Sequence, residues 1–391
     1  MKITFNAESL AGVLTQVASV VNQKSPIRVL SDICMKTFAD NEGKVSMVAT
    51  CSDGETWVSS LCDITDGDAG INIAVNAKDF VSTLRSLGGR SVDLEVDEES
   101  HTVKGAYLNG HFMLPYDNAD EFPSPNIADN DRKEFFVDSK KLSTAIDAVE
   151  YATANLVTKP QFNGINFRIS EDMMVAAAID GQKIAKYSDF TVKSDFGNSE
   201  FTVHAVPCRL ISRVLSKLEG DVKFSFDDNN IIVSRKEFRI TARQLSGNFP
   251  NYDSHIPSYS PVKVTACREE LMESIKRVMY FGNEQSELIV VTLKDGEMNL
   301  SAESALDSKS ASETVKCDYE GEPFEIGFKA TYMLDVFGNM PCENIVIGLT
   351  SPKMIAVVTP ETQAEGSEYL TLLMPMVINL QPINTKSENE E

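Results

Sequence analysis

The sequence lacks the features of a membrane-spanning or secreted protein. No stretch approaches the roughly 18 consecutive apolar residues that a membrane helix needs. The N-terminus, MKITFNAESL, has no long apolar segment and no cleavage site, so we expect no signal peptide. These absences favour a protein of the cytoplasm with no membrane partner.

Histidine and cysteine are few and are not spaced as metal ligands. The four histidines show no HxxH, HExxH or HxH pattern, and the seven cysteines include no CxxC pair. Several cysteines fall inside helix or strand patterns, which favours buried free thiols in a reducing cytosol. We therefore expect neither a metal site nor a disulfide framework.

Motifs for catalysis and nucleotide binding are also absent. The sequence contains no GxSxG, P-loop or GxGxxG. Asp93, Glu95 and Asp97 alternate along one strand pattern. Paired carboxylates can perform acid–base chemistry, but this spacing is typical of a solvated strand face. A hydrolase or transferase without a visible site stays open as one alternative, although the lack of a nucleophile–base pair argues against it, and we expect no cofactor.

A large internal repeat organises the chain. Residues 199–234 read as a strand, a helix, a turn with glycine and a hairpin, with Pro207 expected at the first helical position. The same unit recurs at 71–103 and 324–358. A strand–helix unit also precedes each copy. A repeat of this size is a whole small domain, so we expect three domains with two helices of about three turns in each.

The charges are unevenly distributed. The net charge is −22, which taken alone argues against nucleic-acid binding. The expected helices nevertheless carry cations, because Arg209, Arg213 and Lys217 recur four residues apart without an acid among them. A basic helical layer against an acidic remainder favours two faces with different neighbours. Ordinary solvated helix faces remain an alternative, as does a repeat-built scaffold that binds only proteins.

Several stretches, in order, carry a resemblance to a known family. They include SPIRVLSDICMKT, HFMLPYDNADEFPSP, MVAAAIDGQKIAKYS, ITARQLSGNFPNYDSHIP, FEIGFKATYMLDVFGNM and YLTLLMPM. With these stretches the chain resembles the bacterial DNA polymerase III beta subunit, the replicative sliding clamp, from Met1 to about Ile378. The resemblance implies a DNA-binding processivity factor of the replicative polymerase, and not an enzyme.

The resemblance implies an α+β fold of three repeated clamp domains, each with two helices packed on antiparallel sheets. The expected domains are 1–127, 132–257 and 260–378, followed by an acidic, disordered tail at 379–391. Two subunits are expected to join head to tail into a closed ring of six domains, with the helices lining the hole. Binding by enclosure needs no base-reading side chain, which answers the objection from net charge.

The resemblance also places three sets of functional residues. DNA-facing positions would be Lys24, Lys78, Arg85, Lys140, Lys141, Lys159, Arg209, Arg213, Lys217, Lys276 and Arg277. A hydrophobic pocket between domains two and three would bind short apolar peptides through Phe162, Ile179, Gly181, Gln182, Lys183, Ile184, Pro250, His255, Leu373, Met374, Pro375 and Met376. The dimer seam would involve Phe112, Leu114, Tyr280 and Phe281.

The chain departs from the family pattern at the pocket and at the DNA side. Gln182-Lys183 stands where clamps commonly carry His-Arg, and Val377 stands where an Arg is common. Ser254 and His255 differ as well, and Pro160 and Gln161 replace aromatic residues. The implied partners are a second copy of the chain, duplex DNA, the DNA polymerase III alpha subunit, the clamp loader, other polymerases, and mismatch-repair or ligase proteins. The implied location is cytoplasmic, at the nucleoid.

Overall fold

The computed structural model describes residues 1–127 and 132–378. By internal contacts the chain forms two compact units. The first combines Met1–Thr144 with Val192–Leu245, and the second combines Ala145–Thr191 with Ser246–Glu391. The middle repeat therefore contributes to both units. The tail expected at 379–391 lies outside the described residues.

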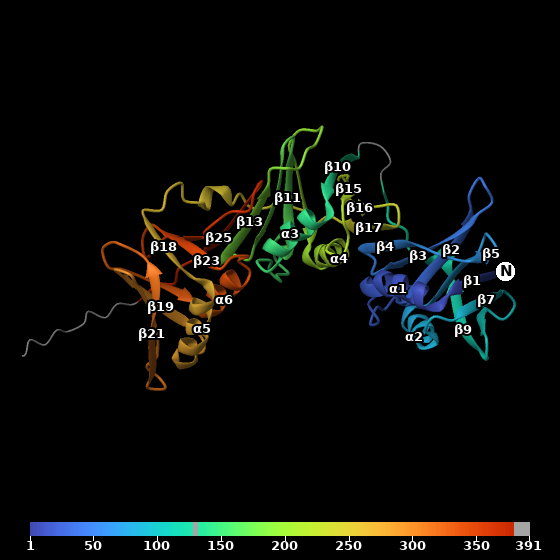
Figure 1. Cartoon of the computed structure of the whole chain (residues 1–391), viewed down its shortest axis with the longest axis horizontal. Helices are drawn as coiled ribbons and strands as arrows, with labels where there is room; N and C mark the ends of the chain where they lie inside the picture. The colour runs from blue at the N-terminus through green and yellow to red at the C-terminus, as the bar shows by residue number, and fades with distance from the viewer. Residues whose placement is uncertain (128–131, 379–391) are drawn as a thin grey trace, which may run out of the picture. The chain divides into compact units, whose positions relative to one another are not determined.

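In residues 1–127 and 132–378, six α-helices occur at the places where the repeat predicts them (Figure 1). They are α1 (Ala7–Val17), α2 (Ala77–Leu87), α3 (Ser139–Glu150), α4 (Ala205–Leu215), α5 (Arg268–Val278) and α6 (Ala330–Gly338). Capping residues determine where several of these helices begin and end. Asn6 and Asn76 cap α1 and α2 by accepting hydrogen bonds from the backbone N–H groups of Ser9 and Asp79. Gly88 ends α2 with a φ of 59°, a conformation that glycine adopts without strain.

The start of α4 differs from the sequence expectation. The helix begins at Ala205 rather than at Pro207, because the His204 side chain accepts a hydrogen bond from the N–H of Val206 and caps the helix two residues earlier. Pro207 still lies within the first turn, where its missing N–H costs no helical hydrogen bond.

The first unit is built on one continuous antiparallel sheet. Its strand order is β10-β15-β16-β17-β4-β3-β2-β6-β9-β8-β7-β1-β5. The strands are β1 (Lys2–Asn6), β2 (Asp32–Ala39), β3 (Val45–Ser52), β4 (Thr56–Cys62), β5 (Asp66–Gly67), β6 (Asn72–Asn76), β7 (Ser91–Asp97), β8 (Thr102–Tyr107), β9 (Gly110–Asn118), β10 (Lys133–Asp138), β15 (Asp221–Phe226), β16 (Asn230–Ser234) and β17 (Phe238–Arg243). β14 (Ser199–His204) precedes α4. The pairing of β17 with β4 joins the middle repeat to the first one.

The second unit has the same design. Its strands follow the order β11-β12-β13-β25-β24-β23-β18-β21-β20-β19-β22. They are β11 (Gly164–Ser170), β12 (Met173–Ile179), β13 (Lys183–Asp189), β18 (Val262–Cys267), β19 (Leu288–Lys294), β20 (Glu297–Ser304), β21 (Lys309–Asp318), β22 (Phe324–Lys329), β23 (Asn344–Leu349), β24 (Ala356–Pro360) and β25 (Ser367–Leu373). Here the pairing of β13 with β25 joins the middle repeat to the last one.

The core lies between the helices and the inner faces of the sheets. Along β7, for example, Val92, Leu94 and Val96 are buried while the alternate residues are not, as a one-sided strand requires. The large side chains Phe5 and Phe80 are fully buried in the first unit, and Phe337 is fully buried in the second. Sequence periodicity of two in strands and 3.6 in helices thus accounts for the layered arrangement.

All seven cysteines are free thiols, and Cys34, Cys51, Cys62 and Cys208 are buried. Burial raises the pKa of the Cys62 thiol to about 12, so this side chain stays protonated and behaves as a small apolar group. Within residues 1–127 and 132–378 no helix is long and apolar enough to cross a membrane. No cluster of three or more His, Cys, Asp or Glu suited to a metal ion occurs in the same ranges.

Candidate functional site

Helix α4 carries Arg209 and Arg213, and the turn after it carries Lys217, which the sequence placed on the same helix. Arg209, Arg213 and Lys217 are exposed, whereas Leu210, Ile211 and Val214 bury the opposite stripe. His204, at the N-terminus of α4, uses Nδ1 as the hydrogen-bond acceptor for the cap. Burial and the nearby Arg209 hold the pKa of His204 below its ordinary value, so the ring is neutral when it caps the helix.

Two of the other predicted DNA-facing cations, Arg85 and Lys140, make polar contacts with neighbouring side chains. Arg85 on α2 donates a hydrogen bond to Thr15 Oγ1 on α1 at 2.8 Å, and Lys78 is exposed on α2. Lys140 Nζ lies 3.2 Å from Glu219 Oε1, an exposed pair that contributes little to stability. Lys24 is exposed in the loop after α1, while Lys141 is exposed at the start of α3.

On helix α5, the cation Arg277 is paired with a carboxylate through two hydrogen bonds. Arg277 Nε and Nη2 donate to the Glu313 carboxylate at 2.8 and 2.9 Å, a fork that holds the guanidinium against β21. These hydrogen bonds raise the pKa of Arg277. Lys276 stays exposed. On α5, Lys276 is therefore exposed while Arg277 is held by Glu313.

An apolar cluster in the second unit occupies the place expected for the peptide pocket. Its buried members are Ala177, Ile184, Tyr252, Leu370 and Leu372. Partly buried apolar side chains surround it, namely Ile179, Phe249, Ile256, Ile355 and Val357. The cluster draws on β12, β13, β24 and β25 and on the segment before β18, so residues of the middle and last repeats share one apolar surface.

A tight turn forms one wall beside this cluster. Asp180 Oδ1 accepts hydrogen bonds from the N–H groups of Gln182 and Lys183, both at 2.8 Å. Gly181 has a φ of 93°, which only glycine adopts readily. The end of β25 lies alongside, because the N–H of Met374 donates to the Gln182 carbonyl at 2.9 Å. The turn between β12 and β13 and the C-terminal strand therefore hold each other.

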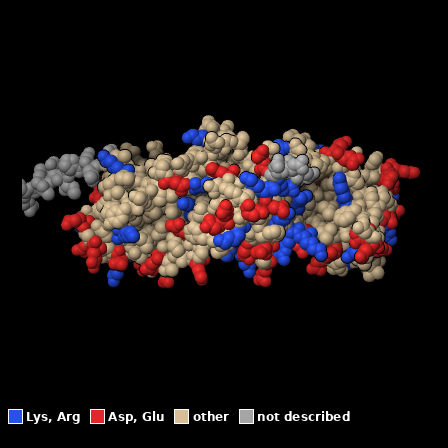
Figure 2. All heavy atoms as spheres, turned by 90° about the horizontal axis from the view of Figure 1, so that it is seen from above, with Lys and Arg blue, Asp and Glu red and all other residues tan. Residues whose placement is uncertain are grey.

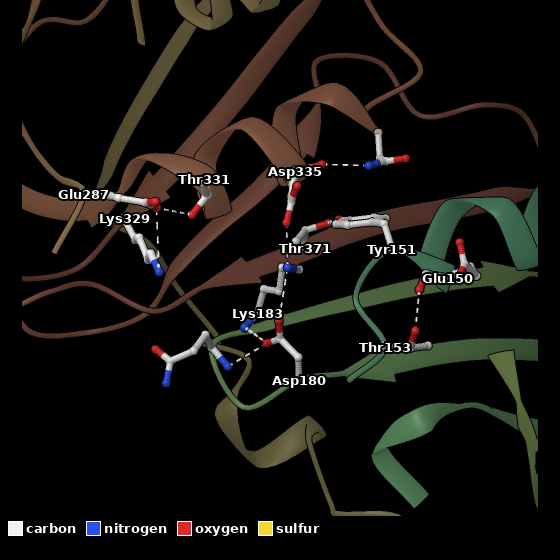
Figure 3. A network of polar contacts seen from close by, with 12 residues as sticks. Glu150, Tyr151, Thr153, Asp180, Lys183, Glu287, Lys329, Thr331, Asp335 and Thr371 are labelled. Carbon is white, nitrogen blue, oxygen red and sulfur yellow. Dashed lines mark hydrogen bonds and ion pairs between the residues drawn. The ribbon is translucent and has the colours of Figure 1, made fainter. Parts of the chain in front are cut away.

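Lys183 is a buried cation at this wall (Figure 3). Its Nζ lies 2.8 Å from Asp335 Oδ2 on α6 and 3.1 Å from Asp180 Oδ2, and 4.9 Å from the centroid of the Tyr332 ring. Burial opposes the charge, but the two carboxylates outweigh it and raise the pKa of Lys183. The ammonium thus ties the middle repeat to the last one inside the second unit.

Some predicted pocket residues, among them Phe162, Pro250 and His255, are not members of the apolar cluster. Phe162 is buried in the 3₁₀ turn Pro160–Asn163, where Lys159 Nζ lies 5.0 Å from its ring centroid. Pro250 and His255 belong to the segment that carries Tyr252, and His255 Nδ1 lies 3.3 Å from Ser254 Oγ. Past Leu373 the chain turns towards β22, since the N–H of Met376 donates to the Gly327 carbonyl. Pro375 lies between these contacts, and Met374 is 41% exposed.

Within the part of the chain that the structure describes, each end repeat leaves part of one strand without a neighbouring strand on one side. Among the described strands, residues 110–115 of β9 pair only with β8, whereas residues 116–118 pair with β6. In β21, residues 309–316 pair only with β20 among the described strands. Phe112 lies on the free half of β9 against Gly105, where a larger residue would overlap the ring. Tyr280 and Phe281, in the 3₁₀ turn after α5, are 86% and 45% exposed.

Family models match the chain in three consecutive segments. They are the DNA polymerase III beta subunit N-terminal domain at 1–127, its central domain at 136–251 and its C-terminal domain at 254–376. The chain belongs to the DNA polymerase III beta subunit family. This family consists of sliding clamps, which are non-catalytic processivity factors that bind DNA and polymerase.

Individual members of the beta subunit family match the chain over nearly its whole length. The beta sliding clamps of Vibrio cholerae and Pseudomonas putida are 25% and 26% identical, and each match covers 96% of this chain and 100% of the relative. The crystal structure of a Pseudomonas aeruginosa sliding clamp bound to griselimycin has a TM-score of 0.89 at 24% identity, covering 97% of this chain and 100% of that one. A Thermotoga maritima beta subunit has a TM-score of 0.85 at 21% identity. The expected α+β fold of three clamp domains is confirmed.

Sequence reasoning missed several residues in and near the apolar cluster. Tyr252 is a buried member of the apolar cluster, and the Arg168 guanidinium stacks on its ring at 4.5 Å while donating to Asp253 at 2.6 Å. Asp335 was missed as well. Strand alternation could have indicated Leu370 and Leu372, but no local pattern links Arg168 or Asp335 to partners 85 and 152 residues away.

Proposed function

We propose that the chain is the replicative sliding clamp of its cell, which encircles duplex DNA without sequence specificity and tethers the DNA polymerase III alpha subunit. The order of the three beta subunit domains along one chain is the observation that carries this proposal. We further propose the domain limits 1–127, 132–257 and 260–378 and a cytoplasmic location at the nucleoid. The clamp loader, other polymerases, and mismatch-repair or ligase proteins would use the same pocket.

The test of enclosure compares circular with linear DNA. The protein is loaded onto nicked circular DNA with a clamp loader and ATP, passed over a sizing column in high salt, and the measurement is repeated after the circle is cut. Retention on the circle together with loss from the linear form is expected, because salt screens direct contacts but not enclosure. Equal loss from both forms would contradict the proposal and favour a protein-binding scaffold.

Strand pairing supports a head-to-tail homodimer. Each domain consists of two halves, and each half ends in a strand. In the first unit β4, which ends the first half of domain one, pairs with β17, which ends the second half of domain two. In the second unit β13, which ends the first half of domain two, pairs in the same way with β25, which ends the second half of domain three. By the same rule β21, which ends the first half of domain three, would pair with β9, which ends the second half of domain one, in a second copy of the chain. Because these two edges differ, the contact is heterologous and closes as a ring when it is repeated. Two copies would give six domains.

The seam prediction concerns Phe112 and Phe281. Replacing both by Ala removes two partly exposed aromatic side chains beside the free strand edges, and we expect the dimer to dissociate at nanomolar concentration in analytical ultracentrifugation. Tyr259→Ala, which removes another ring that is 71% exposed, is the matched control and should leave the dimer intact. A persistent dimer of the double variant would mean that the seam lies elsewhere.

The pocket prediction concerns Ile179. An Asp at this position places a carboxylate at the rim of the apolar cluster, where a partner's Leu or Phe would be buried. Since burial of one such side chain contributes about 1.5–3 kcal/mol, we expect at least a tenfold loss of affinity for a labelled apolar peptide from the polymerase alpha subunit. Fluorescence anisotropy of the labelled peptide measures this affinity, and the control variant Tyr259→Asp should leave it unchanged. Unchanged affinity would place the peptide on another surface.

A further inference from the structure

The outer face of the sheet in the first unit carries an open row of polar and aromatic side chains. The row crosses neighbouring strands at matched positions, in the order Lys193, Phe136, Lys223, Ser234, Arg239, Ser59 and Thr50. Paired residues of antiparallel strands point to the same side of a sheet. With about 4.8 Å between strands, the six steps span roughly 29 Å.

The row lies on the face opposite the helices. Its neighbours along the strands, such as Phe135, Phe224 and Ile240, point into the core and are buried. The next row on the same outer face is also buried, since Ile232, Thr241 and Trp57 are at most 3% exposed. Phe136 is instead 63% exposed. The Phe136 ring is thus exposed between Lys193 and Lys223, while the adjacent row of the same face is covered. We call the row from Lys193 to Thr50 the strip, and the exposed ring indicates that a ligand can bind there.

The strip is basic in an acidic protein. Within the described residues, Lys193 and Arg239 form no ion pair, whereas Lys223 Nζ lies 2.5 Å from Glu134 Oε2. In the view from above, Lys and Arg side chains gather right of centre, in the region where Figure 1 places β10, β15, β16, β17 and α4 (Figure 2). Acidic side chains are spread over most of the remaining surface in that view.

We propose that this strip binds single-stranded nucleic acid without sequence preference. Lys193 and Arg239 would contact phosphates, one base would stack on the Phe136 ring, and the hydroxyls of Ser234 and Ser59 would donate to the backbone. Proteins that bind single strands combine the same two elements, a cationic track and an exposed aromatic platform. An acidic peptide would use the cations but would have no need of the ring, so the exposed Phe136 favours the nucleic acid.

The proposed strip shares no residue with the predicted DNA-facing set or with the peptide pocket. It lies on the sheet face turned away from α4, and its residues all belong to the first unit. A clamp with this strip could hold a single strand outside its ring while duplex DNA passes through the hole.

Anisotropy of a labelled 12-nucleotide thymidine strand tests the proposal on the full-length protein. Phe136→Leu keeps an apolar side chain but removes the stacking surface, so we expect about tenfold weaker binding, while Phe136→Trp should bind at least as tightly as the unmodified protein. Lys193→Gln with Arg239→Gln should weaken binding and lower the slope of log K against log salt by about 1.4, because two phosphate contacts are lost.

The controls separate the strip from general charge and from misfolding. Lys294→Gln, an exposed cation outside the strip, should leave the affinity within twofold, and every variant should still be retained on circular DNA. The proposal is overturned if the unmodified protein does not bind the strand, if Phe136→Leu binds as well as the unmodified protein, or if polyglutamate displaces the strand at equal charge concentration. The last result would identify an acidic protein segment as the ligand.

Discussion

Replacing Lys183 by Met is expected to lower the free energy of unfolding by about 3 kcal/mol, because it leaves two carboxylates facing each other without their cation. Lys183 is 5% exposed, and the side chain of Asp180 is 15% exposed. Asp335 is half exposed and can be partly solvated, so the loss should fall at the lower end of the range for a broken buried pair. Urea denaturation at pH 7.5, followed by circular dichroism, measures the change.

A triple variant sharpens this test. Lys183→Met combined with Asp180→Asn and Asp335→Asn removes all three charges, and we expect it to regain most of the lost stability, because an uncompensated charge costs more than a missing ion pair. Lys186→Met is the matched single control. Its Nζ is 3.4 Å from Asp253, which keeps Arg168 as a partner. A triple variant no more stable than Lys183→Met would show that packing of the Lys183 stem, and not its charge, is what matters.

The same variant should affect the proposed pocket. Lys183 holds the turn Asp180–Lys183 against α6, and that turn forms the wall beside the apolar cluster. We expect Lys183→Met to weaken peptide binding, whereas Lys183→Arg, which keeps the cation, should weaken it less. Because the folded pKa of Lys183 is raised, its stabilising contribution is present below the ordinary lysine pKa and is lost only as the pH rises through the folded value. The contribution is therefore constant across neutral pH.

Replacing Asp32 by Asn is expected to stabilise the first unit by about 3 kcal/mol at pH 8. Asp32 is 3% exposed at the start of β2. Burial, and then the neighbouring carboxylate of Asp117, raise the pKa of Asp32 to about 6. The hydrogen bond that the Ser31 hydroxyl donates to Asp32, and then the charge of Arg28, whose Nε lies 3.0 Å from Asp117 Oδ2, offset this only in part. The fold therefore carries a carboxylate that is less favourable inside the protein than in the unfolded chain.

The pH dependence gives the direction of the effect. The folded pKa of Asp32 lies above the unfolded value of about 3.9, so the folded state binds more protons between about pH 4 and pH 6. The cost of Asp32 is full above pH 6 and fades as the pH falls towards 4. The advantage of Asp32→Asn should therefore shrink by about half between pH 8 and pH 5.

Fluorescence offers a selective measurement for this variant. Trp57 is the only tryptophan, and it packs in the first unit with Cys34, the residue on β2 two places after Asp32. The fluorescence of Trp57 during urea unfolding therefore reports on the unfolding of the first unit, which contains Asp32. Glu42→Gln, an exposed acid in the same unit, is the control and should change stability by less than about 0.5 kcal/mol. Equal stability of Asp32→Asn and the unmodified protein at pH 8 would contradict a raised pKa.

The sequence by itself determined the elements and their repetition. Alternation along β7 and the apolar stripe of α4 follow from local periodicity, which depends only on neighbours along the chain. The order of the family stretches determined the three clamp domains. The position of the cap at His204 was not foreseen, since histidine is rarely the residue that caps a helix.

Tertiary structure decided which distant residues meet. The pairing of β13 with β25 brings Lys183 opposite Leu373, and the helix α6 then supplies Asp335, which no spacing in the sequence indicates. The pairing of β17 with β4 likewise carries the row from Phe136 across to Thr50. Local pattern specifies which face of a strand is polar. Which polar side chains lie next to one another across the sheet depends on the register between strands that are far apart in the chain. That register is set by the packing of whole domains.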